Sequence, residues 1–221
     1  KLMGVNIELN SLGHRYKEIS IQKNTDEYRI HVIGSSMTLG WGVENEKTFT
    51  AVLEKMLNEN KFIKESYNNI NVINAGIGNT NTQHHYHLFK DQYKITKPDT
   101  LILQYFVNDA EIIKKKKNNF FIRTSYVAAF LYQQILSLSF FGTLDNYYQN
   151  LYLDSSPGWL AAKESVFKLK KISEQNNINF IIMIIPDLHT FSNENGLFSI
   201  YKKIENEFAQ MNIPIINTYN S

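Results

Sequence analysis

Short apolar runs recur along this chain, and each of them ends in a cluster of small polar residues. The run at residues 100–107 is almost entirely apolar, which is typical of a central strand in a parallel sheet. Segments with helical spacing separate these runs, as in the stretch that follows Thr48. Strands that alternate with helices favour a parallel sheet whose two faces are both covered by helices.

The pattern predicts strands at residues 29–33, 70–74, 100–107, 178–185 and 213–217. It also predicts a helix capped by Thr48, another at residues 82–93, and a third that Ser156 and Pro157 open as cap and first residue. Because crossover connections are right-handed, the natural strand order is the flavodoxin-like 2-1-3-4-5. The sequence therefore predicts an α/β fold with a five-stranded parallel sheet between two helical layers.

The length of 221 residues fits one such domain. We expect an irregular lead-in at residues 1–28 and a single domain at 29–221, with an insertion at about 110–157. The insertion holds a basic run at 114–117, interpreted as solvated, and an aromatic-rich part, interpreted as a helical cap or a lid over a pocket. Residues 126–141 are too few and too polar to span a bilayer.

Composition excludes several classes of function. The net charge of +2 favours no nucleic-acid partner, and the absence of cysteine excludes disulfides, thiolate metal sites and a cysteine nucleophile. His84, His85 and His87 lie on a predicted helix, where residues two apart point to different faces. We interpret them as surface histidines, and no metal or cofactor is expected.

The polar residues that end the predicted strands are candidates for chemistry, because ligands bind at the carboxyl ends of open α/β sheets. Ser36 follows the first strand and is a candidate nucleophile. A backbone N–H of the Gly78-Asn79 turn and the amide of Asn108 are candidate donors to an oxyanion. The alternative is that glycine and serine stand in these loops only because tight turns need them.

The resemblance to a known family follows from three segments. Gly34-Ser35-Ser36 with Thr38 and Gly40, then residues 74–79 (NAGIGN), then residues 106–109 (FVND) resemble the first three blocks of the SGNH, or GDSL-type, esterases. The blocks are in the right order and at the right strand ends, and the resemblance covers the chain from about Arg29 onward. It implies a three-layer α/β/α fold and a serine-dependent ester hydrolase.

The same resemblance implies roles for individual residues. Ser36 would be the nucleophile that forms an acyl-enzyme. The oxyanion hole would consist of the Ser36 N–H, a backbone N–H at Gly78 or Asn79, and the Asn108 side chain. The segments GWGV, NDAE and SPGWLAAK are similar to those of a subgroup of this family that is associated with bacterial surface polysaccharides. We therefore expect a glycan ester or another small ester as substrate, an O-acetyl ester among them, and a place in the cell envelope outside the cytoplasm of a bacterium.

The chain departs from the family pattern in two places. Ser35 stands where the family has an aspartate that supports the turn, and we expect either that its hydroxyl bonds the local backbone instead or that the turn is looser. The family's final Asp-x-x-His block would lie beyond Ser221, so we expect the chain to be trimmed at its C-terminus. Within the chain, His189 is the candidate base and Asp187 its partner; the alternative is that both only line the pocket.

Two other classes of function remain open on these residues. The first is a non-catalytic glycan-binding or assembly module, which the unusual Ser35 and the missing histidine block would suit. The second is a nucleotide binder that uses residues 34–40 as a phosphate loop. The second lacks both the Lys-Ser/Thr of a P-loop and the spacing of a dinucleotide fingerprint.

Overall fold

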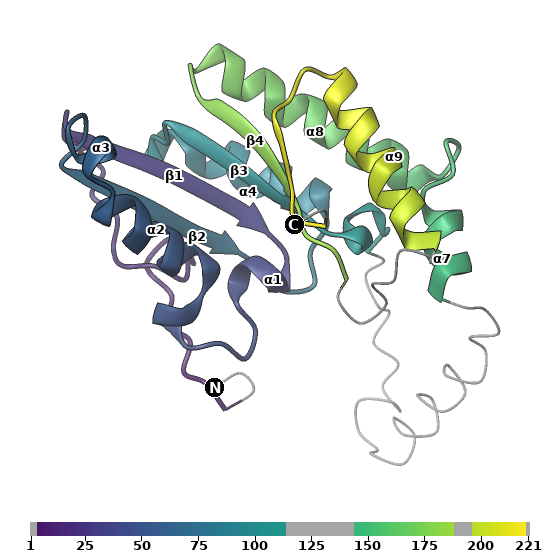
Figure 1. Ribbon diagram of the computed structural model, residues 1–221, viewed down its shortest axis with the longest axis horizontal. Helices are drawn as coiled ribbons and strands as arrows, with labels where there is room; N and C mark the ends of the chain where they lie inside the picture. Colours follow the sequence, from purple (N-terminus) through teal and green to yellow (C-terminus); the bar gives the residue numbers. More distant parts are fainter. Residues whose placement is uncertain (1–3, 114–143, 188–195, 220–221) are drawn as a thin grey trace.

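The computed structural model describes residues 4–113, 144–187 and 196–219. Within them the strands form one parallel sheet in the order β2-β1-β3-β4-β5 (Figure 1). The strands are β1 (Glu27–Gly34), β2 (Asn69–Gly76), β3 (Thr100–Tyr105), β4 (Asn179–Ile184) and β5 (Ile215–Asn217). The predicted fold class and strand order are confirmed.

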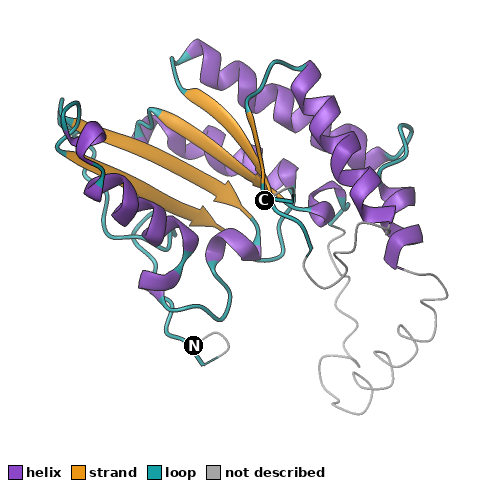
Figure 2. Cartoon of the chain, viewed as in Figure 1, coloured by secondary structure: helices purple, strands orange, loops and turns teal. Residues whose placement is uncertain are grey.

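Helices cover both faces of this sheet (Figure 2). The α-helices are α1 (Ser36–Leu39), α2 (Phe49–Glu59), α3 (Lys61–Lys64), α4 (Thr82–Thr96), α7 (Leu144–Leu151), α8 (Pro157–Gln175) and α9 (Gly196–Gln210). In the part of the chain that the structure describes, the 3-10 helices η1 (Asn45–Lys47) and η2 (Val107–Ala110) stand in loops. Helices α4, α8 and α9 pack on one face, and α2 with α3 packs on the other.

The two faces of the sheet bury two hydrophobic cores, because successive side chains of a strand point to opposite sides. Ile33 and Leu103 belong to the larger core, which also contains Trp159 of α8 and Phe208 of α9. Val32 belongs to the smaller core, with β2 and the apolar side of α2. Since β1 is buried on both faces, it is the rigid centre from which the first strand-end loop projects.

Some element boundaries differ from the sequence prediction. The third strand ends at Tyr105 instead of residue 107, because the Asp109 carboxylate accepts the Phe106 N–H at 2.8 Å and turns the chain into η2. The Thr48 cap is confirmed, since its Oγ1 accepts the Ala51 N–H at 3.3 Å. Ser156 precedes Pro157 at the start of α8, but its side chain makes no capping hydrogen bond.

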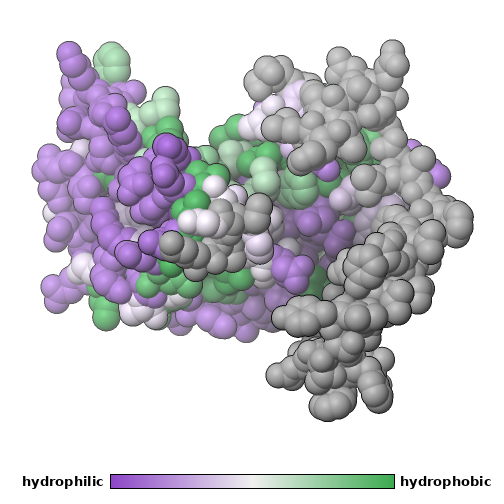
Figure 3. Space-filling model, turned by 90° about the horizontal axis from the view of Figure 1, so that it is seen from below, coloured by the Kyte–Doolittle hydropathy of each residue, from purple (hydrophilic) through white to green (hydrophobic). Residues whose placement is uncertain are grey.

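The lead-in is irregular along most of its length, yet parts of it are well buried. His14 and Arg15 are both almost completely buried, and the Arg15 N–H donates to the Asn74 carbonyl of β2 at 3.0 Å. Hydrophilic residues prevail on the surface over the α2 and α3 side of the molecule (Figure 3). No helix within the described ranges is long and apolar enough to cross a membrane. The basic run and most of the aromatic insertion lie outside the described residues.

Candidate active site

Ser36 stands at the carboxyl edge of the sheet, directly after its first strand. Strand β1 ends at Gly34, and Ser36 begins the short helix α1 and is half-buried. Because β1 lies between β2 and β3, the loops that follow those two strands flank the Ser36 loop (Figure 1). The sheet thus brings to one edge the loops that carry Ser36, Gly78-Asn79 and Asn108.

Close packing holds α1 against the end of β2. A Cβ atom on Gly76 would lie 2.2 Å from the Leu39 backbone nitrogen, so only glycine permits this approach. The Asn74 side chain donates to the Thr38 carbonyl at 2.8 Å, and its Oδ1 accepts the Gly76 N–H at 3.1 Å. Gly76 and Asn74, which belong to the second sequence block, therefore fix the position of the serine loop relative to the end of β2.

Arg15 from the lead-in holds the other end of this loop. Its guanidinium donates to the carbonyls of Leu39 at 2.8 Å, Gly40 at 2.7 Å and Val43 at 2.6 Å. These carbonyls follow α1 or end it, where helical backbone acceptors lack partners within the helix. Sequence analysis assigned the lead-in no role, and the buried arginine shows that it supports the serine loop.

Ser35 does not replace the family's aspartate in the way that we expected. Its side chain is buried, and its Oγ has no hydrogen-bond partner among the described residues. The expectation that Ser35 bonds the local backbone is therefore wrong. Support at this point comes from Thr38 instead, whose hydroxyl donates to Gln104 Oε1 of β3 at 2.9 Å.

The turn after β2 carries the second predicted donor. Asn79 has a φ of 59°, a left-handed conformation that asparagine tolerates better than most residues. The indole ring of Trp41 lies beside Gly78, with ring atoms 3.3 and 3.5 Å from the position of an added Cβ. Trp41, Met37 and Ile77 are each between 40% and 49% exposed. Apolar surface therefore borders the Ser36 loop and the Gly78-Asn79 turn.

The loop after β3 carries Asn108 and Asp109. Asn108 is half-buried in η2, and its Oδ1 is buried without a hydrogen-bond partner in the described part of the chain. Asp109 is buried, and its carboxylate caps η2 by accepting the Phe106 N–H. Burial raises the pKa of the Asp109 carboxyl well above its usual range, and the nearby Glu111 charge adds to this.

Asp187 follows β4 and lies near α7 and α9. Its backbone N–H donates to the Tyr201 hydroxyl at 2.7 Å. Burial raises the pKa of Tyr148 to about 12, as it does for Tyr201, and the Asp187 carboxylate contributes to both shifts. His189 lies outside the described residues. The pairing of these two residues as base and partner stays a prediction.

The structure corrects the interpretation of the helical histidines. His84 and His87 are exposed as predicted, but His85 is 1% exposed. Burial lowers the pKa of His85 to about 3, and a nearby His84 adds to the effect. The signal was present in the sequence, because Thr82, His85 and Phe89 follow one another at three- and four-residue spacing along the buried side of α4.

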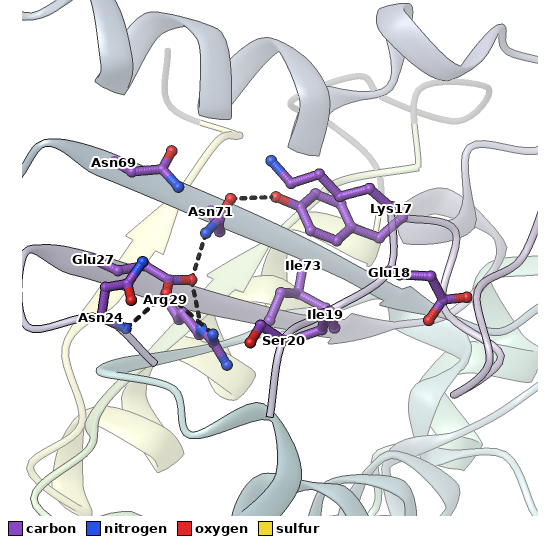
Figure 4. Close-up of a pocket in the computed structure, with 11 residues that line it drawn as sticks. Lys17, Glu18, Ile19, Ser20, Asn24, Glu27, Arg29, Asn69, Asn71 and Ile73 are labelled. Atoms are coloured by element: carbon purple, nitrogen blue, oxygen red, sulfur yellow. Dashed lines mark hydrogen bonds and ion pairs between the residues drawn. The ribbon is translucent and has the colours of Figure 1, made fainter. Parts of the chain in front are cut away.

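Three cavities open elsewhere in the described part of the molecule, with volumes of about 200, 640 and 380 Å³. All three are lined by Tyr16 and Lys17 of the lead-in. The first lies at the amino end of β1 and β2, where Glu27, Arg29 and Asn71 point toward one another (Figure 4). Within the described ranges, no group of histidine and acidic side chains is arranged to hold a metal ion.

Several solved structures have a similar fold. TesA superposes with a TM-score of 0.51 and 12% sequence identity, over 85% of this chain and 76% of TesA. Lower TM-scores link the chain to an acetyl xylan esterase, AlAXEase (0.48, 16% identity, 87% and 78% covered), and to AlinE4, an SGNH-hydrolase family esterase (0.47, 14% identity, 88% and 77% covered). No family model and no curated protein matches the sequence. The chain therefore shares the fold of TesA, with its parallel sheet in the predicted strand order.

Proposed function

We propose that the protein is a serine ester hydrolase that removes an acyl or acetyl group from a carbohydrate or another small ester. One observation carries the proposal: Ser36 directly follows β1 and lies between the loops after β2 and β3. Those two loops hold Asn79 and Asn108, whose N–H groups suit an oxyanion. The likeness to the solved esterases is one of fold, so the activity is argued from these residues.

In the proposed reaction the Ser36 Oγ attacks the ester carbonyl carbon and gives its proton to a base. Negative charge then develops on the carbonyl oxygen, which the Ser36 and Asn79 backbone N–H groups and the Asn108 amide stabilise. The alcohol leaves with the proton from the base, and the acyl group stays on Ser36. Water attacks this acyl-enzyme and releases the free acid, which restores the serine.

The base is the part of the proposal that needs a further residue. A histidine suits this role because its pKa lies close to neutral. His189 is the candidate within this sequence, with Asp187 at the end of β4 as its partner. Both assignments are proposals, as is a location in the cell envelope outside the cytoplasm.

The surroundings of Ser36 support a substrate with an apolar face. Met37 is the next residue, Trp41 lies beside Gly78, and Ile77 begins the turn, all of them partly exposed. The flat ring of a tryptophan can pack against an acyl group or against the apolar face of a sugar. We therefore place the acyl or sugar part of the substrate against Trp41.

A covalent probe tests the nucleophile directly. We expect a fluorophosphonate to label the protein once, at Ser36, and p-nitrophenyl acetate to be hydrolysed. Ser36→Ala should abolish labelling and lower kcat by several orders of magnitude, because removal of a nucleophile can cost roughly 10⁶-fold. Ser35→Ala is the matched control: its hydroxyl is buried and unpaired, so its loss should leave folding and labelling unchanged.

Two results would contradict the proposal. Ser36→Ala with the turnover of the unmodified protein would exclude Ser36 as nucleophile. A protein that binds glycans but neither reacts with the probe nor hydrolyses the ester would instead be a non-catalytic binding module. The unpaired Ser35 hydroxyl, which gives the serine turn no support, is the observation that favours this second function.

A further inference from the structure

The buried imidazole of His85 lies where the three strand-end loops meet. Its Nε2 is 3.0 Å from Thr80 Oγ1, in the loop after β2. Its Nδ1 is 3.9 Å from Asp109 Oδ1, in η2 after β3. The backbone of Gly34, the last residue of β1, also interacts with the ring and opposes the fall of its pKa. One side chain of α4 thus reaches all three loops.

Each of these contacts adjoins a residue of the proposed active site. The pairs are Thr80 beside Asn79, Asp109 beside Asn108, and Gly34 two residues before Ser36. The Thr80 hydroxyl in turn donates to the Ile77 carbonyl at 2.5 Å, which closes the turn that holds Asn79. A shift of His85 would therefore be transmitted to the backbone next to the proposed nucleophile and next to two proposed oxyanion donors.

Other ties between these loops are less extensive. The Thr82 hydroxyl donates to the Asp109 carbonyl at 3.3 Å, and the Asn81 side chain donates to the Glu111 carbonyl at 2.7 Å. Both hydrogen bonds join the loop after β2 to the segment after β3, and neither includes β1. The end of β1 is tied to the turn after β2 by the Ile77 N–H, which donates to the Gly34 carbonyl at 3.0 Å. His85 adds to these ties a side chain of α4 that reaches both the turn after β2 and the segment after β3.

The His85 imidazole is uncharged at neutral pH, and it is buried away from the substrate. It is 1% exposed, and burial lowers its pKa far below neutral. Burial has the opposite effect on the pKa of Asp109, which it raises, so the pair is not a charged ion pair at neutral pH. The contact with Asp109 is one of packing, and the side-chain hydrogen bond of the ring is the one to Thr80, so both depend on the geometry of the ring.

We propose that His85 is a positioning residue, which sets the spacing among Ser36, Asn79 and Asn108. The inference rests on the proposed function, because these three residues matter together only if they act on one substrate. Displacement of a reacting group by about 1 Å can cost about 10²-fold in rate, so a support for all three loops has a measurable effect.

Replacement of the ring tests the role. His85→Phe keeps a ring of similar volume but removes both nitrogens, His85→Gln keeps a polar side chain, and the exposed His87→Phe on the same helix is the matched control. For p-nitrophenyl acetate we expect His85→Phe to lower kcat about 10- to 100-fold with KM changed by less than about twofold. His85→Gln should recover part of the loss, and His87→Phe should match the unmodified protein.

Amide hydrogen exchange measured by mass spectrometry separates this inference from the proposed function. In His85→Phe, peptides that cover residues 77–82 and 106–110 should exchange faster, while peptides from β1 and β3 stay protected. An unchanged kcat, or faster exchange throughout the chain, would overturn the positioning role. If the unmodified protein hydrolyses no ester, the proposed function fails, and local exchange still shows whether His85 fixes the loops.

Discussion

The two ends of the central sheet differ in how far their buried polar groups have hydrogen-bond partners. At the amino end, Arg29 forms two hydrogen bonds to Glu27, at 2.6 and 3.1 Å (Figure 4). Asn71 donates to the same carboxylate at 2.6 Å, and the Tyr16 hydroxyl bridges Asn71 and Glu54. This chain of contacts joins β1, β2, α2 and the lead-in, and it satisfies the charges that it buries.

At the carboxyl end, buried polar atoms are left without partners in the described part of the chain. They include Ser35 Oγ, His85 Nδ1, Gln104 Nε2, Asn108 Oδ1 and Asp109 Oδ1. A buried polar atom without a hydrogen bond lowers stability by about 1–3 kcal/mol. Such groups are rare in folded proteins, and a catalytic role is one reason for their presence. The contrast separates an end built for stability from an end that gives up stability at the proposed active site.

The largest effect on stability is expected at the amino end. Arg29→Met leaves the nearly buried Glu27 charge without its partner, and this should lower the free energy of unfolding by about 3–5 kcal/mol in urea titrations. Activity per folded molecule should be unchanged. The double variant Glu27→Gln/Arg29→Met should recover much of the loss, since it removes both charges. A loss below about 1 kcal/mol in the single variant would mean that the pair is not the anchor of this end.

The reverse result is expected for Asn108→Ala at the carboxyl end. Loss of one oxyanion donor should lower kcat by about 10²–10³-fold, measured with p-nitrophenyl acetate. The free energy of unfolding should change little, because the Asn108 Oδ1 has no partner to lose among the described residues. The exposed Asn150→Ala is the control for both measurements. A large loss of stability with normal kcat would show that Asn108 has a structural role and not a catalytic one.

The smallest effect is expected for His31, which lies in the middle of β1, between the two ends of the sheet that are compared above. Burial lowers the pKa of His31 well below its usual value near 6.5, and that of His14 beside it is lowered as well. The unfolded chain binds the proton and the folded chain does not, so each group makes stability fall as the pH drops below about 6.5, by up to about 1.4 kcal/mol per pH unit.

Urea titrations at pH 7.5 and pH 5.5 measure this slope. His31→Gln should flatten it relative to the unmodified protein, and the exposed His87→Gln should not. Asp109 acts in the opposite direction, because its raised pKa makes stability fall as the pH rises, so only the difference between variants isolates His31. An unchanged slope in His31→Gln would show that the pKa of His31 is the same in the folded and the unfolded chain.

The fold could be predicted because its signals are local. Apolar runs, the Thr48 cap and the polar residues at strand ends are readable within a few residues, and they give the strands and their order. The end of β3 was missed because a side chain, Asp109, turns the backbone into η2. Local sequence patterns therefore predict the positions of strands better than they predict the residues at which strands end.

The supports of the candidate site were harder to predict, because they depend on contacts between distant segments. His85 is three residues from Thr82 but reaches Asp109 only through the packing of α4 beside η2. The Ser35 hydroxyl is buried without a hydrogen-bond partner, which follows from how the surrounding segments pack around it. The motif residues Ser36 and Asn108 were found from the sequence, and their roles in catalysis remain predictions.

The three hydrogen bonds of Arg15 have a consequence for how the protein is divided. A boundary at residue 27, where β1 begins, would keep the whole sheet and yet remove the guanidinium that holds Leu39, Gly40 and Val43. The smallest unit that keeps the proposed active site supported is therefore longer than the region that carries the sequence motifs. A version shortened in this way loses the side chain that holds its serine loop, although it keeps every strand.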